Sequence, residues 1–362
     1  MQATPSSYSI HEDQPMKTPA LRGGLLALLA ATLFGVSTPL VQYFGAGLGA
    51  LTTAALLYAG AAVAGALLRR GVKREAGLRR SDVPRLLLVV AFGAVIGPVA
   101  LAWGLQRTSG ASASLMLTLE ALFTAVLAWR LYRESMDVRV WAAMALLLAG
   151  GVVLILAQGQ LGGTHLAGML AVLVATAAWG IDNTLSRALA ERDPGQVVMV
   201  KAALGVAVTA VLALAFSEPA PRWSAAAGLL AVGATGYGLS LRFYLLAQRA
   251  FGAARTGSVF AFAPFIGALL ALAMGDRSVS AWVGAGGLLM LGGVLLHLVE
   301  SHGHTHDHAA QDHEHAHDHA DGHHQHTHSP LPEGSHSHLH HHEAQAHAHA
   351  HVPDAHHQHR HG

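Results

Sequence analysis

Apolar runs of about 20 residues recur along this chain between residues 24 and 299. An α-helix rises about 1.5 Å per residue, so a run of that length crosses the roughly 30 Å hydrocarbon core of a bilayer. Hydrophobic residues make up 52% of the sequence and charged residues 12%, which is about half the charged share of a soluble domain. The sequence therefore predicts an all-α polytopic membrane protein. Its ten expected transmembrane helices cover residues 24–43, 48–68, 86–106, 111–131, 138–157, 165–186, 195–216, 224–246, 253–274 and 280–299.

Positive charges are concentrated in alternate connections between these spans. Sixteen Lys and Arg residues fall on one side of the expected membrane, and three, Arg107, Arg222 and Arg277, fall on the other. Short cytoplasmic connections carry the excess of Lys and Arg, so both termini are expected in the cytoplasm. Residues 1–23 are expected to form a disordered cytoplasmic N-terminus. The sequence contains no cysteine, which excludes disulfides, thiolate catalysis and thiolate metal sites.

The membrane region contains an internal repeat. A shift of 145 residues places residues 34–40 on residues 179–185, and a shift of 142 places Gly150 and Gly151 on Gly292 and Gly293. We therefore predict two five-helix units, at residues 24–157 and 165–299. Five is an odd number, so the second unit is expected to enter the membrane from the opposite face. Two inverted halves around a midplane site are typical of alternating-access carriers.

The fourth expected span has the pattern Ala-Ser-Ala-Ser-Leu-Met-Leu-Thr-Leu-Glu-Ala-Leu-Phe-Thr-Ala-Val-Leu-Ala-Trp at residues 111–129, followed by Glu134, and the last span ends with Gly-Gly-Val. Together with the ten spans and the duplication, this resembles the EamA-type carriers of the drug/metabolite transporter (DMT) superfamily over residues 24–299. The resemblance implies an inner-membrane carrier for a small metabolite, amino acid or drug, with a central cavity between its halves. The chain departs from the family at Ala121, where a proline is common, and at Ala263, which replaces the acid before Pro264.

Glu120 is the single carboxylate of the fourth expected span. A charge at mid-bilayer costs about 3 kcal/mol even on lenient insertion scales, so such a residue faces the bundle interior or a water-filled cavity. These surroundings disfavour the ionised form and make reversible protonation feasible. We interpret Glu120 as a proton or substrate-cation site. The alternative is a protonated glutamate that is hydrogen-bonded to a neighbouring helix as a packing contact.

Three further ionisable residues lie inside expected spans. Asp182 and Lys201 lie at similar depth on consecutive antiparallel helices, which predicts an ion pair. We favour a structural clamp over a gate for this pair, and Asn183 fits either arrangement. Arg242 in the eighth span has three alternatives, which are binding a substrate carboxylate, pairing with Glu120 and reaching a lipid phosphate.

Aromatic residues complete the expected substrate site. Trp179 and Phe34 occupy matching places in the two copies, and Tyr237 lies in the eighth span. We expect these residues to line a central pocket. The alternative is packing or interfacial anchoring, which aromatic residues in membrane spans often provide. Gly93 and Gly97 form a Gly-x-x-x-Gly pair that we interpret as a helix-packing device.

The segment 300–362 has a different composition. It holds 24 of the 27 histidines, mostly in His-x-His alternation with Asp and Glu. Such a segment cannot bury a core, so we expect a disordered cytoplasmic tail. Imidazole and carboxylate ligands favour Zn, Ni, Co and Cu, and we expect several sites without unique geometry. The expected metal ligands include His302, His304, His306, His308, His313, His315, His317, His319, His323 and His324.

These features predict a secondary-active transporter of a small organic solute that works by alternating access, with a metal-binding tail that regulates it. The alternative is a divalent metal (Ni, Co or Zn) exporter whose tail collects the ion. We do not expect an enzyme, because no histidine lies at the depth of the serines in the fourth span. The expected partners are the small-molecule substrate, the lipid bilayer, divalent metal ions at the tail and, if the carrier dimerises, a second copy. No nucleic acid and no required cofactor are expected.

Overall fold

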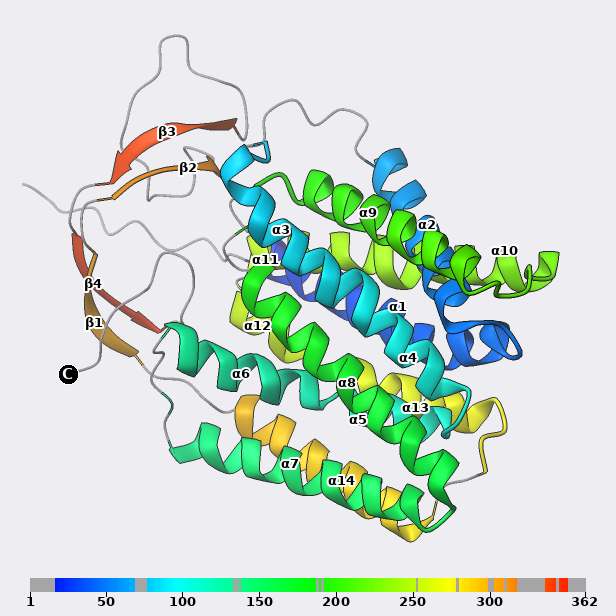
Figure 1. Cartoon of the computed structure of the whole chain (residues 1–362). Helices are drawn as coiled ribbons and strands as arrows, with labels where there is room; N and C mark the ends of the chain where they lie inside the picture. Colours follow the sequence, from blue (N-terminus) through cyan, green and yellow to red (C-terminus); the bar gives the residue numbers. More distant parts are fainter. Residues whose placement is uncertain are drawn as a thin grey trace, which may run out of the picture.

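The computed structural model describes residues 17–68, 77–132, 136, 138–186, 189, 192–251, 253–277, 280–298, 303–308, 311–317, 336–342 and 345–350 (Figure 1). Within these residues, nine helical stretches are long and apolar enough to cross a membrane. A shorter apolar helix, Ala281–His297, falls in the tenth expected span. The expected polytopic helical fold is therefore confirmed, whereas the count of ten spans stays a prediction.

The helices fall into two sets along the chain. The first set is α1 (Lys17–Gly45), α2 (Ala50–Leu68), η1 (Arg80–Asp82), α3 (Val83–Val90), η2 (Ala91–Ile96), α4 (Gly97–Leu105), α5 (Gly110–Met116), α6 (Leu119–Tyr132) and α7 (Val138–Gly159). The second set is α8 (Gly163–Ser186), α9 (Pro194–Ala215), α10 (Trp223–Val232), η4 (Gly233–Leu239), α11 (Ser240–Phe251), α12 (Ala253–Phe260), α13 (Ala263–Ala273) and α14 (Ala281–Leu298). The two sets pack against each other, most extensively through α7 on α14 and α2 on α9.

Two spans contain a π-helical segment, η2 in the third span and η4 in the eighth. A π-helical turn frees a backbone carbonyl for another donor and is frequent at functional sites. Helix α2 approaches the eighth span closely at two glycines, Gly60 and Gly233. A Cβ on Gly233 would lie 1.9 Å from the Leu57 carbonyl oxygen, and a Cβ on Gly60 would lie 2.1 Å from that of Leu230. Glycine is therefore required where α2 crosses the eighth span.

The fourth and ninth spans are each broken in the middle, between α5 and α6 and between α12 and α13. The apolar windows predict spans at 111–131 and 253–274, and the structure adds a break to each. At the first break, the Glu120 amide donates to the Leu117 carbonyl at 3.0 Å, a three-residue spacing in place of the helical four. At the second, Pro264 has no N–H to donate to the Phe260 carbonyl.

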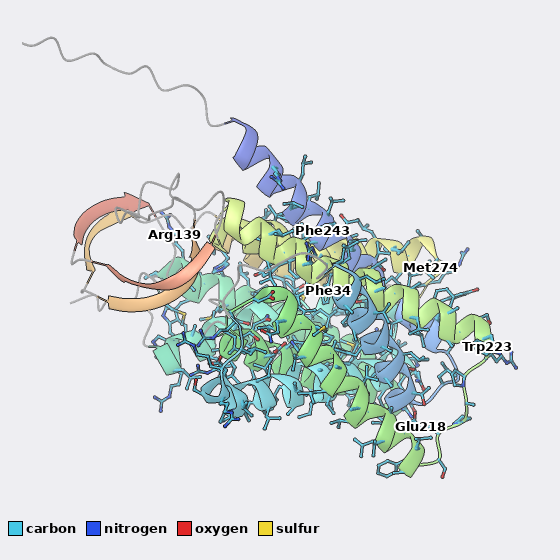
Figure 2. All side chains as sticks on the ribbon, turned by 90° about the horizontal axis from the view of Figure 1, so that it is seen from above. Phe34, Arg139, Glu218, Trp223, Phe243 and Met274 are labelled. Atoms are coloured by element: carbon cyan, nitrogen blue, oxygen red, sulfur yellow. The ribbon has the colours of Figure 1, made fainter. Side chains whose placement is uncertain are left out.

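The two ends of the bundle are packed differently. Figure 2 shows Glu218 and Met274 toward one end, which we call the distal end, and Arg139 at the opposite, proximal end. In the fourth span, residues 110–119 are all buried, whereas none of residues 120–131 is. Helix α5 packs against α13, but α6 packs against α8 and α12 packs against α1. The two broken spans therefore meet in their distal halves and turn to different neighbours in their proximal halves.

Four short strands lie in the His-rich segment, β1 (Gly303–His308), β2 (Gln311–His317), β3 (His336–His342) and β4 (Gln345–Ala350). β1 pairs with β4 and β2 pairs with β3, both antiparallel, with His306 opposite His347 and His315 opposite His338. These segments differ from the expected disordered tail, because His-x-His alternation has the two-residue period of a strand. Two-stranded ladders are marginally stable by themselves in water, so the fold depends on the helices.

Replacing Gly233 by alanine should destabilise the bundle, because the added Cβ has no room against the Leu57 carbonyl. We expect a loss of about 1–3 kcal/mol in the free energy of unfolding, measured as a lower thermal midpoint in detergent. Gly284→Ala in α14 is the matched control, since nothing lies within 4 Å of its added Cβ. Helix propensity favours that alanine by about 1 kcal/mol. Equal midpoints for the two variants would contradict the close crossing.

Candidate functional site

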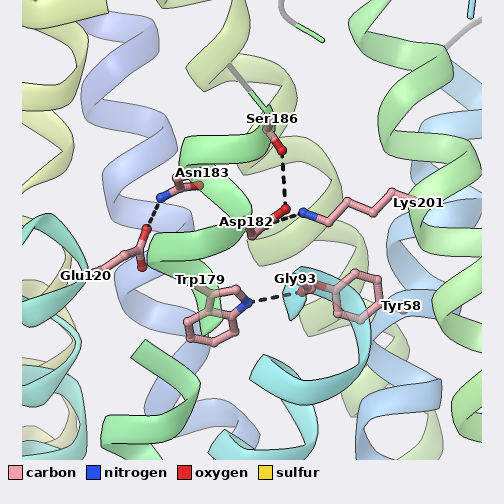
Figure 3. A network of polar contacts seen from close by, with 8 residues as sticks. All are labelled: Tyr58, Gly93, Glu120, Trp179, Asp182, Asn183, Ser186 and Lys201. Carbon is pink, nitrogen blue, oxygen red and sulfur yellow. Dashed lines mark hydrogen bonds and ion pairs between the residues drawn. The ribbon is translucent and has the colours of Figure 1, made fainter. Parts of the chain in front are cut away.

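A buried ion pair lies at the centre of the polar network in Figure 3. Lys201 Nζ on α9 lies 2.5 Å from Asp182 Oδ2 on α8, and both side chains are largely buried. Ser186 Oγ donates to the second oxygen of the same carboxylate at 3.2 Å. The ion pair expected from the equal depth of the two residues is therefore confirmed. Mutual attraction and the added hydrogen bond offset the cost of burying both charges.

Gly93 in η2 makes room for the Asp182 carboxylate. A Cβ on Gly93 would lie 2.2 Å from Asp182 Oδ2, so a larger residue would displace the carboxylate. The Gly93 carbonyl accepts hydrogen bonds from Trp179 Nε1, at 3.1 Å, and from Tyr58 Oη. One glycine thus joins α2, α8 and the ion pair. Its Gly-x-x-x-Gly pattern marked it only as a packing residue, and nothing in the sequence singled out Tyr58.

Glu120 lies on the other side of α8 from the ion pair (Figure 3). Asn183 Nδ2 donates to Glu120 Oε1 at 2.5 Å. Glu120 is partly exposed and Asn183 is exposed, although both belong to helices of spanning length. Exposure of a carboxylate to lipid at this depth would cost several kcal/mol. An interior-facing Glu120 stays a prediction.

Arg242 makes its contact elsewhere. Its Nη1 donates to the carbonyl of Leu68, the last residue of α2, at 3.2 Å. A guanidinium at a helix C-terminus is stabilised by the partial negative charge there. The alternative in which Arg242 pairs with Glu120 is therefore wrong for this structure, because Glu120 accepts a hydrogen bond from Asn183. The substrate-carboxylate and lipid-phosphate alternatives stay predictions.

Five aromatic rings, which we call the aromatic cluster, gather beside this network. The ring centroid of Phe34 lies 6.2 Å from Trp179, 6.0 Å from Tyr237 and 5.4 Å from Phe260. Tyr237 also lies 5.7 Å from Tyr58 and 6.5 Å from Trp179. Trp179, Tyr58 and Tyr237 are buried, whereas Phe34 and Phe260 are partly exposed. Both helix sets contribute rings, and Trp179 contacts Phe34. That these rings line a substrate pocket stays a prediction.

Several buried hydroxyl groups have no hydrogen-bond partner within the described part of the chain. They are Ser114 Oγ, Thr118 Oγ1 and Thr124 Oγ1 on the broken fourth span, and Tyr237 Oη in the aromatic cluster. Buried polar groups are nearly always paired, so each of these marks a place for a ligand, a water molecule or a contact in another conformation. The sequence analysis considered the serines of the fourth span only as nucleophiles and did not consider Thr118, which lies in the break between α5 and α6.

Side-chain hydrogen bonds, which we call the distal seal, hold the distal end together. Gln42 Nε2 donates to the carbonyls of Leu105, at 2.7 Å, and Thr108, at 2.9 Å. Gln158 Nε2 donates to Ser112 Oγ at 2.8 Å, and Gln158 Oε1 accepts from Thr108 Oγ1 at 3.2 Å. The distal seal therefore joins α1, α5 and α7 around the connection that precedes α5.

Two carboxylates of the second helix set cap helices of the first set at the same end. Glu218 accepts from the Thr52 amide at 2.7 Å, at the start of α2. Asp276 Oδ2 accepts from the Ala111 amide at 3.0 Å, at the start of α5. Carboxylates at helix N-termini satisfy free amides and oppose the positive end of the helix dipole. Both contacts tie the two sets of helices together at the distal end.

Among the side chains that the structure describes, no group of three or more His, Asp or Glu residues is placed to hold a metal ion. His302, His319, His323 and His324 lie outside the described residues, as do the side chains of the other expected tail ligands. Binding of Zn, Ni, Co or Cu by the tail therefore stays a prediction. The same holds for the alternative of a metal exporter.

Removing one member of the buried ion pair should cost more stability than removing both. Lys201→Met leaves the Asp182 carboxylate buried without its cation, and we expect a loss of about 3–5 kcal/mol in the free energy of unfolding. The double variant, which adds Asp182→Asn, removes both charges and should recover at least about 1 kcal/mol. Thermal midpoints in detergent measure the difference. Asp182→Asn alone gives the second single loss. If the losses of Lys201→Met and Asp182→Asn simply add in the double variant, the two charges do not interact.

Comparisons with known proteins identify the family. Residues 21–157 and residues 166–299 each match the EamA-like transporter family. An uncharacterized transporter of Methanothermobacter thermautotrophicus is 28% identical over 295 residues, which cover 75% of this chain and 85% of that protein. A crystal structure of another protein shares the fold with a TM-score of 0.57 and 21% identity, covering 76% of this chain and 94% of that one. The resemblance seen in the sequence is confirmed, and the chain belongs to the EamA-like transporter family.

Proposed function

We propose that this protein is a secondary-active transporter that moves a small organic solute across the inner membrane by alternating access. Membership of a transporter family supports movement of a solute across a membrane. The candidate substrate site is the Glu120–Asn183 pair together with the aromatic cluster. The observation that carries the proposal is the contrast between the closed distal half and the open proximal half of the broken fourth span.

Alternating access requires a barrier on one side of the site at a time. On the distal side, residues 110–119 are buried and α5 packs against α13, so the distal seal is that barrier. On the proximal side, Glu120 and Asn183 remain accessible. The two broken spans contact each other through α5 and α13 and are each interrupted in the middle, which lets their distal and proximal halves open and close in turn. The conformation therefore corresponds to a state that is open at the proximal end.

The energetics of the distal seal are compatible with such an exchange. Gln42 and Gln158 make four of its hydrogen bonds. Each contributes about 0.5–1.5 kcal/mol net, because the same groups bond to water when the seal opens. A comparable number of new contacts between α6 and α12 would balance that loss. Two states that differ by only a few kcal/mol are what a carrier needs to populate both.

Matching construction of the two helix sets supports an inverted repeat. Each set contains a π-helical segment, η2 or η4, followed by a broken span. Each set also matches the family separately. In an inverted arrangement, exchanging the contacts of the two halves converts a state open at one end into a state open at the other. The excess of Lys and Arg on one side supports cytoplasmic termini, which makes the proximal end cytoplasmic.

The polar residues of the site take different roles in this proposal. Glu120 exchanges a proton with the opening and couples transport to the proton gradient, while Asn183 holds its carboxyl group in place. Asp182 and Lys201 act as a clamp that positions α8 against α9. Trp179, one helical turn before Asn183, forms a wall of the site.

Thiol labelling of single introduced cysteines should measure the difference in accessibility between the proximal and distal sides. The chain has no cysteine of its own, so no other residue contributes to the labelling signal. Asn183→Cys lies beside Glu120 on the exposed proximal side, and Ser114→Cys lies in the buried half of the fourth span. A membrane-impermeant thiol reagent at the proximal side should modify Asn183→Cys at least about tenfold faster than Ser114→Cys. A substrate gradient that drives the cycle should then expose Ser114→Cys to reagent at the distal side. Equal rates from the proximal side would contradict the proposal.

Glu120→Gln should remove the dependence of transport on a pH gradient. Glutamine keeps the shape of the side chain and its hydrogen bond with Asn183 but carries no exchangeable acid proton. Solute flux in reconstituted vesicles, with and without an imposed gradient, measures the effect, and membrane insertion should be unchanged. Full gradient dependence in this variant would exclude Glu120 from coupling.

A further inference from the structure

One carboxylate of the candidate site has no ion pair within the described part of the chain. Asp182 and Lys201 neutralise each other at 2.5 Å. Arg242 is directed to the Leu68 carbonyl, at the end of α2. Glu120, in contrast, is hydrogen-bonded to the neutral amide of Asn183. Within the described part of the chain, neither Glu120 nor Arg242 has a charged partner within 4.0 Å. The Arg242 guanidinium is held at the end of α2 by the Leu68 carbonyl, so an ionised Glu120 beside Asn183 is a carboxylate without a direct ion pair.

The aromatic cluster adds a second preference for positive charge. Trp179 and Asn183 are four residues apart on α8, so the indole ring and the partner of Glu120 lie on the same helix face. Aromatic ring faces attract ammonium groups, by about 0.5–1 kcal/mol at exposed sites and more when water is excluded. Phe34 and Phe260 are the partly exposed rings of the cluster, which makes their edge its accessible side.

An unpartnered hydroxyl completes the set. Tyr237 is 9% exposed, its Oη has no hydrogen-bond partner within the described residues, and its ring touches Phe34, Tyr58 and Trp179. The oxygen of that hydroxyl can accept a hydrogen bond from an N–H group. A carboxylate substrate would instead meet Glu120 as a like charge, with both nearby cations already engaged.

We propose that the site binds organic cations, meaning a protonated amine on an apolar or aromatic body. The ammonium pairs with the Glu120 carboxylate, and the apolar body rests on Phe34 and Phe260 at the accessible edge of the aromatic cluster. When the cation leaves, Glu120 takes up a proton and the site is neutral again, so one cation exchanges for one proton. This inference rests on the proposed carrier function and names its substrate class.

Binding of three probes of similar shape to the purified full-length protein tests the charge preference. They are 2-phenylethylammonium, which is a cation, 2-phenylethanol, which is neutral, and 3-phenylpropionate, which is an anion. We expect the cation to bind at least about tenfold tighter than the other two near neutral pH. Equal or tighter binding of the neutral or anionic probe, or no binding of any probe, would overturn the substrate class.

Four variants locate the preference. Glu120→Gln should remove the preference for the cation. Glu120→Asp keeps the charge and should retain part of that preference, so it distinguishes a loss of charge from a folding defect in Glu120→Gln. Tyr237→Phe should weaken cation binding by a few-fold through loss of the hydroxyl. Arg107→Gln removes a charge that contacts Trp103 at the distal end, so it is the control and should leave the preference unchanged. An unchanged preference in Glu120→Gln, or a loss confined to Arg107→Gln, would overturn the assignment.

Vesicle flux of the same probes separates this inference from the carrier proposal. Proton-coupled movement of the cation supports both. Movement of the neutral or anionic probe in its place overturns the substrate class and leaves the carrier standing. Tight cation binding without flux of any probe overturns the carrier proposal and leaves the binding class standing.

Discussion

The ion pair between Asp182 and Lys201 is the interaction on which the centre of the molecule depends. An unpaired charge in the bundle interior costs several kcal/mol, so each side chain is stable there only with the other. The pair and the contact of its carboxylate with Gly93 fix the rotation of α8. Helical spacing then directs Asn183 toward Glu120 and Trp179 toward the Gly93 carbonyl. A structural salt bridge thus orients the residues of the site beside it.

The broken spans follow from the way backbone groups are satisfied in a bilayer. A helix interruption at membrane depth is tolerated only where the freed groups face protein or water. Both interruptions occur in the middle of a span, one beside Glu120 and one beside Pro264. Each break divides a span into two rigid pieces that make different contacts. The same feature therefore explains why residues 110–119 are buried whereas residues 120–131 are not.

Local signals in the sequence predicted many of the structural features. Apolar windows located the helices, because a bilayer demands long apolar segments, and equal depth on consecutive helices predicted the Asp182–Lys201 pair. The sequence could not reveal the break after Met116, since no proline marks it. It also suggested Arg242 as a partner for Glu120, whereas the structure has Asn183. Which helices become neighbours decides that choice, and helix periodicity carries no such information.

The sequence by itself determined the class of molecule, the approximate helices, the internal duplication and the presence of an acid within a spanning helix. These follow from local properties, namely apolar length, charge placement and repeated motifs. Only the tertiary structure decided that Glu120 bonds to Asn183, that Gly93 joins Tyr58 and Trp179, and that the distal end is closed. These contacts join residues distant along the chain, so they depend on helix rotation and packing, which the order of residues along one helix does not specify.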